Sequence, residues 1–210
     1  MKSSLLLKKL YLDKKEFINS YELEKYCNKF NMSYEKTVRY FIRRGYLIRI
    51  FKGIFYVKTL DEIKLGKTNY NHLEILGKGL EVKGVKNWYF GLNSAFKLNN
   101  MTHEEFAVDH IINDRLFRGK VIEIVGYNFR FHKVSSGLLR FGIIKEGEIR
   151  YSDLEKTILD FLYIKRYNGV PEEKIIMDVA DYRDNISSVK IRKYVKYYPK
   201  TVGKTLERLL

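Results

Sequence analysis

The sequence predicts an α+β protein in two parts, residues 1–60 and residues 61–210. Hydrophobic residues make up 45% of the 210 positions, which is enough to bury a core in each part. The first part has helical patterns followed by a hairpin signal. In the second part, short β-branched runs separated by turn residues predict antiparallel strands, and helical patterns follow them to the end.

The first part is predicted to form three helices and a hairpin. A leucine cluster begins the first helix, Ser20 is expected to cap the second, and Ser33 the third, which ends at Gly45. After Gly45 the hydrophobic period changes from 3.6 to 2 residues. The runs YLIRIF and IFYV then flank the turn pair Lys52-Gly53. Three helices followed by a hairpin predict a winged helix-turn-helix.

The second part is expected to begin between Thr59 and Asn69. The run NYNHLEILGKGLEVKG has a helical pattern weakened by glycines, and NWYFGLNSAFKLNN predicts a strand followed by a helix from Leu92. The strands are predicted between residues 106 and 151. Ser152 and Glu155 have the spacing of a capping box and predict a long helix that starts there, with two or three further helices after it.

The positive charge is concentrated at the two ends of the sequence. The net charge is +15; residues 1–60 carry 14 Lys and Arg against 5 Asp and Glu, and residues 190–210 carry 7 against 1. The segment between them sums to zero. Charge placed in this way indicates a polyanionic partner, with double-stranded DNA first and a membrane surface well behind it.

The third helix has an apolar stripe and, on its opposite side, a cationic face. The stripe consists of Tyr34, Val38, Phe41 and Ile42. We expect the opposite face to enter the major groove, where arginine recognises guanine, while the hairpin contacts the DNA backbone. The predicted DNA-binding residues are Lys36, Arg39, Tyr40, Arg43, Arg44, Arg49 and Lys52. Arg44 ranks lowest because it lies toward the side of the helix, where it would cap the C-terminal end. The alternative is a solvated basic helix.

A second basic face is predicted near the end of the chain. In SSVKIRKYVKYY, Ile191, Tyr194, Val195 and Tyr198 share one side. The opposite side carries Lys190, Arg192, Lys193 and Lys196. Three interpretations stay open: a solvated helix face, a second contact to DNA, or a docking surface for an acidic partner.

The sequence contains only weak indications of a catalytic site. Ser152 and Glu155 are explained by helix capping, and Asp160 by pairing with a nearby cation or by capping an adjacent turn. The metal-dependent nuclease alternative rests on an acidic segment with one histidine, but its spacing matches no nuclease motif. Its residues are Glu104, Glu105, Asp109, His110 and Asp114. The four histidines are scattered, and no phosphate-binding glycine loop is present. We therefore expect no enzyme activity, no metal and no cofactor.

The expected compartment is the cytoplasm. The single cysteine, Cys27, lies on an apolar stripe and is expected to be buried, and it has no disulfide partner within the chain. The N-terminal apolar block is short for a signal peptide, and no apolar run reaches the ~20 residues that span a bilayer.

Three stretches resemble the AbiEi-type antitoxins of type IV toxin–antitoxin systems. They are RRGYLIRIFKGIFYV, WYFGLNSAFKLNNM (Trp88–Met101) and YSDLEKTILDFLYIKRYNG (Tyr151–Gly169). The stretches occur in the family's order, while Thr59–Lys86 matches nothing in it. The resemblance implies that residues 1–60 bind inverted repeats in the protein's own promoter and repress it. It also implies that residues 61–210 act as the antitoxin against a nucleotidyltransferase-like toxin encoded alongside.

The sequence also bears on the oligomeric state and on an alternative function. The protein is expected to be a monomer or a weak dimer that pairs on DNA, because no long heptad seam is present. The alternative function is a stand-alone winged-helix transcriptional regulator.

Overall fold

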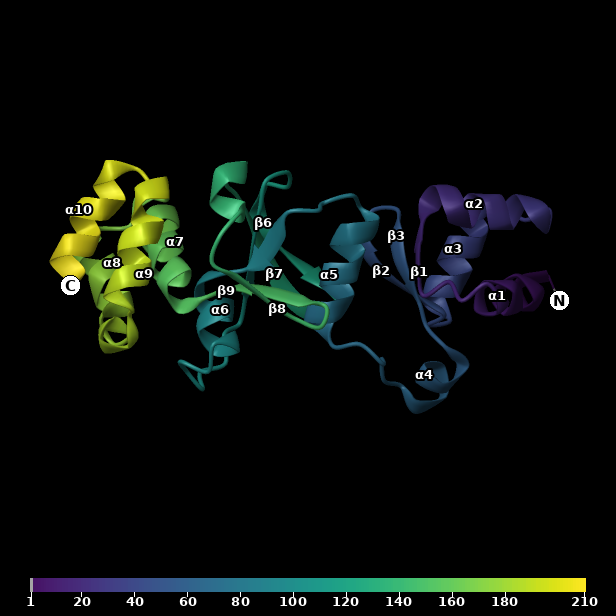
Figure 1. The fold of residues 1–210 in the computed structure, drawn as a ribbon. Helices are drawn as coiled ribbons and strands as arrows, with labels where there is room; N and C mark the ends of the chain where they lie inside the picture. Colours follow the sequence, from purple (N-terminus) through teal and green to yellow (C-terminus); the bar gives the residue numbers. More distant parts are fainter. Residues whose placement is uncertain (1) are drawn as a thin grey trace. The chain divides into compact units, whose positions relative to one another are not determined.

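The computed structural model describes residues 2–210 and divides the chain into two compact units (Figure 1). Unit 1 comprises the chain up to Lys86 together with Glu123–Tyr127. Unit 2 comprises Asn87–Ile122 and Asn128–Leu210. Both units mix helices and strands, so the α+β class is confirmed. Among the described helices, none is long and apolar enough to cross a membrane.

Unit 1 contains the three helices and the hairpin that the sequence predicts. Its elements are α1 (Lys2–Leu12), β1 (Phe17–Asn19), α2 (Ser20–Lys29), α3 (Tyr34–Arg43), β2 (Leu47–Phe51), β3 (Ile54–Val57), α4 (Leu60–Leu65) and α5 (His72–Val82). The three strands form an antiparallel sheet in the order β1-β3-β2.

The capping residue of α2 differs from the prediction. Asn19, not Ser20, is the N-cap, and its side chain accepts a hydrogen bond from the Glu22 N–H at 2.9 Å. Ser20 supports the hairpin turn instead, since its N–H donates to the carbonyl of Gly53 at 2.7 Å. Ser33 does occupy the N-cap of α3, but its side chain makes no capping hydrogen bond.

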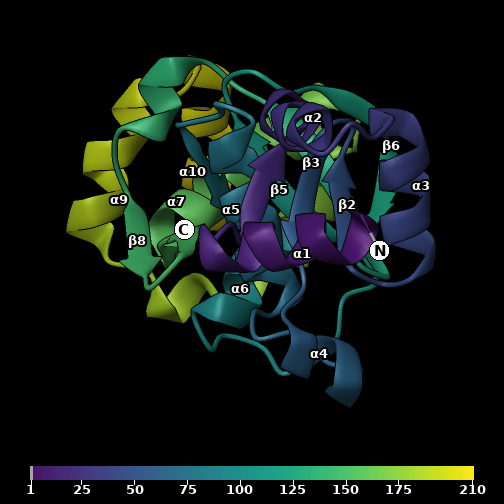
Figure 2. The same ribbon diagram turned by 90° about the vertical axis from the view of Figure 1, so that its right-hand side faces the viewer.

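Helices cover both faces of the unit 1 sheet. On one face α1, α2 and α3 enclose a core that includes Phe41, Phe55 and the fully buried Cys27. Helix α5 packs against all three strands on the other face (Figure 1). Figure 2 shows α1 crossing in front of these strands, with α3 at the edge of the unit. All four residues of β3 are consequently buried.

The predicted boundary at residue 60 differs from the division in the structure, where α4 and α5 belong to unit 1. Helix α4 is attached through Glu62, which is 2% exposed and accepts hydrogen bonds from the Tyr56 hydroxyl and the Asn69 N–H. Helix α5 approaches β2 so closely that a Cβ on Gly79 would lie 2.6 Å from Cγ2 of Ile50. A glycine that weakens the helical pattern thus allows close packing.

Unit 2 is a six-stranded sheet with helices. Its strands are β4 (Trp88–Phe90), β5 (Asp109–Asn113), β6 (Arg118–Ile124), β7 (Tyr127–Lys133), β8 (Ile143–Glu146) and β9 (Ile149–Ser152). The end of β6 and the start of β7 fall within Glu123–Tyr127, which is assigned to unit 1. Its α-helices are α6 (Leu92–Leu98), α7 (Leu154–Tyr167), α8 (Glu172–Ala180), α9 (Ser188–Tyr194) and α10 (Lys200–Leu209). Short 3₁₀ turns are η1 (Ser136–Leu139), η2 (Arg183–Asn185) and η3 (Val195–Tyr197).

The prediction of antiparallel strands is confirmed for part of this sheet and is wrong for the rest. The strand order is β6-β7-β5-β4-β9-β8, in which β5 runs parallel to β7 and β4 runs parallel to β9. The pairs β4–β5 and β8–β9 are antiparallel. A run of strand-type residues identifies a strand but leaves its partner and direction open.

Helix α7 is the centre of unit 2. Ten of its fourteen residues are buried, and α6, α8, α9 and α10 pack around it. Its N-cap is Asp153, whose side chain accepts from the Lys156 N–H at 2.9 Å, so the predicted capping role of Ser152 is wrong. The Ser152 hydroxyl lies 2.7 Å from that of Thr157, within the core.

Replacing Gly53 by alanine tests the hairpin turn. Gly53 has φ +76°, and a Cβ there would lie 3.0 Å from the Ser20 hydroxyl oxygen. Because an L-residue is strained at this φ, we expect Gly53→Ala to lower the free energy of unfolding by about 1–2 kcal/mol in urea titrations. Gly45→Ala is the matched control, since Gly45 has φ +71° and open space around it. Equal losses would contradict the contribution of the Ser20 contact.

Candidate nucleic-acid interface

Helix α3 is held by the apolar stripe that the sequence predicts. Val38 and Phe41 are buried, and the Phe41 ring packs edge-on against Tyr46 with 5.6 Å between the ring centroids. Thr37, which is 3% exposed, adds a hydrogen bond from its hydroxyl to the Ser33 carbonyl at 2.7 Å. Gly45 then turns the chain at positive φ into β2. These contacts fix the orientation of the outer face of α3.

The predicted cations are exposed. They are Lys36, Arg39 and Arg43 on α3, Arg44 at its C-terminal end, Arg49 on β2 and Lys52 in the turn. Within residues 2–210, none of the six forms an ion pair with a carboxylate. Their positive charge is therefore available to an external anion.

Three of these cations gather around one depression between α3 and the hairpin. Arg39, Arg49 and Lys52 line it, and its volume is about 660 Å³. The Arg49 guanidinium lies over the Phe55 ring, 5.8 Å from its centroid, which restricts the side chain. Glu35 contributes the only carboxylate among the lining residues that the structure describes. The depression thus joins the outer face of α3 to the hairpin.

The remaining predicted residues lie elsewhere on the unit. Lys36 and Tyr40 line a separate depression next to Met32. Tyr40 is half-buried, with its ring 6.3 Å from that of Tyr46. Arg44 is the C-cap residue and its guanidinium lies 5.8 Å from the Tyr40 ring. Tyr40 and Arg44 therefore also support the end of α3, whereas the other five predicted residues project outward.

Two residues that line this depression are not among the DNA-binding residues predicted from the sequence. Ser20 and Glu35 line it together with the predicted cations. The spacing of Glu35 and Arg39, four residues apart on a helix, was the available signal for Glu35. No local pattern indicates Ser20, because the hairpin turn that it contacts lies more than thirty residues further along the chain.

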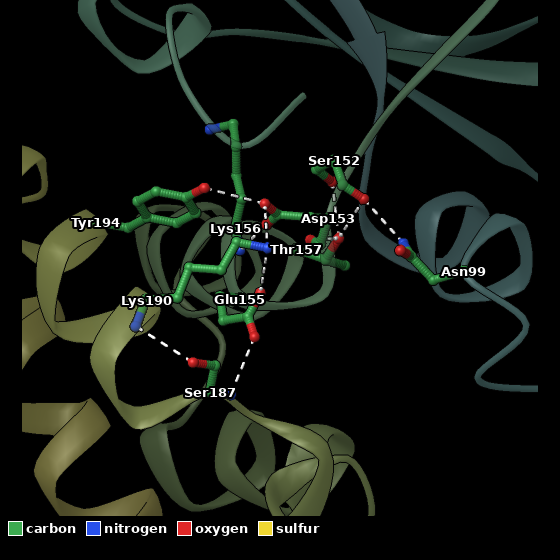
Figure 3. A network of polar contacts seen from close by, with 9 residues as sticks. All are labelled: Asn99, Ser152, Asp153, Glu155, Lys156, Thr157, Ser187, Lys190 and Tyr194. Atoms are coloured by element: carbon green, nitrogen blue, oxygen red, sulfur yellow. Dashed lines mark hydrogen bonds and ion pairs between the residues drawn. The ribbon is translucent and has the colours of Figure 1, made fainter. Parts of the chain in front are cut away.

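The second basic face is smaller than predicted. The Lys190 ammonium pairs with Asp153 at 2.9 Å and with Glu155 at 3.1 Å, as Figure 3 shows for the surrounding network. Burial acts to lower the pKa of Lys190, and the hydrogen bonds to both carboxylates outweigh it and raise this pKa. Lys190 thus connects α9 to the start of α7. The three exposed residues that remain are Arg192, Lys193 and Lys196.

Asp160 has a structural partner, as the sequence predicts. It is fully buried and lies 3.4 Å from the Lys156 ammonium, which is also fully buried. The hydroxyls of Tyr89 and Tyr198 donate to the two oxygens of Asp160 at 2.7 Å and 2.6 Å. The Glu155 carboxylate accepts from the Ser187 N–H at 2.9 Å. These carboxylates hold helices together in the core of unit 2.

The acidic residues of the nuclease alternative do not form a metal site. Within residues 2–210, no three His, Cys, Asp or Glu side chains are close enough to hold an ion. Asp109 accepts from the Ser94 hydroxyl at 2.8 Å. The histidines are less scattered than predicted, because Nδ1 of His110 lies 2.9 Å from Nε2 of His132.

Comparison with known proteins supports the fold alone. No family model matches the chain, and no curated protein matches it. Among solved structures, the chain is similar to the RV2827C protein from Mycobacterium tuberculosis, with a TM-score of 0.63 and 11% sequence identity. The alignment covers 100% of this chain and 76% of that one. This likeness concerns the fold and says nothing of function.

The Lys190 network predicts different roles for two lysines of α9. Asp153 and Glu155 have side chains only 8% and 7% exposed, so removal of their cation leaves two poorly hydrated charges. Lys190→Met is expected to lower the free energy of unfolding by about 1–2 kcal/mol, between the values for surface and buried pairs. Lys193→Met is the control, and urea titration measures both. A loss shared by the two variants would contradict the assignment.

Proposed function

We propose that the chain is a sequence-specific DNA-binding regulator that binds duplex DNA through α3 and the β2–β3 hairpin. The observation that carries the proposal is the set of six exposed cations, none paired with a carboxylate within the described residues. The order α1-β1-α2-α3-β2-β3 agrees with the winged helix-turn-helix expected from the sequence. In that motif the third helix is the recognition helix and the hairpin is the wing.

The dimensions of α3 suit the major groove. An α-helix with side chains is about 10–12 Å wide, and the groove is about 12 Å wide. Arg39 and Arg43 are four residues apart, which is about 6 Å along the helix axis and close to the rise of two base pairs. Both side chains are exposed. They are therefore the residues we assign to guanine O6 and N7 in neighbouring steps.

Lys36, Arg49 and Lys52 are assigned to phosphates. Arg49 and Lys52 lie on the hairpin, which follows α3 along the groove and meets the adjacent backbone. Each neutralised phosphate releases counterions, so these three contacts would give a slope of roughly −3 in a plot of log affinity against log salt concentration. Repression then results from occupation of an operator.

The antitoxin role stays a prediction from the resemblance. The stretches Trp88–Met101 and Tyr151–Gly169 meet in the interior of unit 2, where Phe90 pairs with Tyr151 and the Asn99 amide donates to the Ser152 carbonyl at 2.8 Å. These two stretches form part of the buried core of unit 2, and they do not indicate which surface would contact a toxin. Co-expression with the product of the neighbouring gene tests the role; rescue from toxicity by the full chain would support it.

Substitution of the two arginines on α3 tests sequence recognition. Arg39→Ala and Arg43→Ala should each weaken binding to a duplex selected by the protein from a random library by about 1–3 kcal/mol. Fluorescence anisotropy measures the affinity, and Arg140→Ala, an exposed arginine of unit 2, is the control. Losses that are equal on selected and random duplexes would show that these arginines touch only phosphate.

Substitution of the hairpin lysine tests the backbone contact. Lys52→Ala should weaken binding to selected and random duplexes by the same factor and reduce the salt slope by about 1, because one phosphate contact is lost. Titrations at several salt concentrations give the slope. An unchanged slope, with affinity also unchanged, would remove the hairpin turn from the interface.

A further inference from the structure

Two adjoining depressions of unit 2 form one basin that the DNA-binding proposal does not use. Their volumes are about 520 Å³ and about 250 Å³. Both are lined by Phe117, His132, Ile164 and Asn168, so they are continuous. Ligand pockets usually measure roughly 300–1,000 Å³, and this basin is large enough for a small organic molecule.

The smaller depression is strongly cationic. Arg118 of β6, Arg130 of β7 and Lys165 of α7 line it, and Lys133 lines the larger one. No aspartate or glutamate is among the described residues that line either depression. Within residues 2–210, none of these four cations has a carboxylate partner, although the Lys165 ammonium lies 5.0 Å from the Phe161 ring. Four cations at one basin repel one another until an anion binds.

His110 and His132 both line the smaller depression, beside these cations. Burial, together with the nearby charges of His132, Lys165 and Arg130, lowers the pKa of His110 to about 3 against the opposing effect of Asp109. Burial lowers the pKa of His132 to about 4, together with Arg130 and Lys165. Both imidazoles are therefore uncharged at neutral pH and leave the positive charge to the arginines and lysines.

The other part of the basin presents aromatic rings. Phe117 is 70% exposed and Tyr167 is 84% exposed, while Tyr163 is half-buried. Large exposed rings beside a pocket offer flat apolar surface to a planar ligand, and the Asn168 amide offers both a donor and an acceptor. The basin thus combines a place for a planar ring with a place for an anion.

We propose that this basin binds a free nucleoside 5′-monophosphate, with the phosphate held by Arg118, Arg130 and Lys165 and the base placed against Phe117 and Tyr167. Guanidinium groups suit phosphate because they donate paired hydrogen bonds to its oxygens. Base stacking on aromatic side chains supplies the remaining affinity. The proposal does not depend on DNA binding, because the site lies in unit 2 and is tested without DNA.

Isothermal titration calorimetry of the full chain with AMP, GMP, CMP and UMP tests the proposal. At least one of these nucleotides should show saturable binding, and the matching nucleoside and inorganic phosphate should each bind at least about tenfold more weakly. Binding of none of the four would overturn it. Inorganic phosphate that binds as tightly as the nucleotide would also overturn it, because the base would then contribute nothing.

Substitutions locate the site. The double variant Arg118→Ser/Arg130→Ser should weaken nucleotide binding by at least about tenfold, since both phosphate forks are lost. Lys145→Ser, an exposed lysine of β8, should leave it unchanged. Should the double variant unfold, as judged by circular dichroism, Tyr167→Ser supplies the same test through the exposed ring. Unchanged affinity in the folded variants would refute the placement.

The NMR signals of the two histidine side chains give an independent test of the proposed phosphate position. A bound phosphate adds negative charge beside His110 and His132, so proton NMR should show the pKa values of both imidazoles moving upward on addition of the nucleotide. His72 and His103 do not line the basin and should not respond. A single-stranded oligonucleotide that binds more tightly than every mononucleotide, and loses affinity in the same variants, would assign the basin to nucleic acid and overturn the free nucleotide.

Discussion

The burial of strand β3 on both faces is the constraint on which unit 1 depends. Ile54–Val57 are all buried, with α1 to α3 on one side of the sheet and α5 on the other. Each large apolar side chain removed from water in this way contributes about 1.5–3 kcal/mol. A shift of β3 by one residue would exchange its side chains between these two faces and disrupt the packing on both. The β2–β3 hairpin and α3 are thereby held rigidly, and a rigid cationic surface loses less entropy when it binds DNA.

The cationic side chains fall into two groups, those paired with carboxylates and those without such a partner within the described residues. Lys156 is fully buried and pairs with Asp160, and Lys190 is held by Asp153 and Glu155. Their carboxylate partners offset part of the cost of burying these charges, so removal of either partner would leave an uncompensated charge in unit 2. The cations of α3 and the hairpin have none within the described residues. Their mutual repulsion costs free energy in the isolated protein, and neutralisation by an external polyanion relieves that cost.

The sequence predicted elements well and their partners poorly. Helices α1, α2, α3 and α5 of unit 1 and the turn at Gly53 follow from local periodicity and a glycine at positive φ, whereas α4 was not predicted. Both predicted caps are one residue away from the observed ones, because Asn19 and Asp153 stand beside the predicted Ser20 and Ser152, and Asn, Asp and Ser all cap helices. The parallel pairs of the unit 2 sheet depend on contacts distant in sequence, which a local pattern does not encode.

The same limit applies to electrostatics. Residues 61–189 contain as many acidic as basic residues, so a sum along the chain gives no excess charge. Folding separates these charges: Asp153 and Glu155 bind Lys190, while Arg118 and Arg130 line a basin without acidic residues in its described lining. Coulomb interactions fall with distance in space rather than with separation in sequence. A segment with no net charge can therefore form an anion-binding site as readily as a basic segment can. A profile of charge along the sequence does not detect such a site.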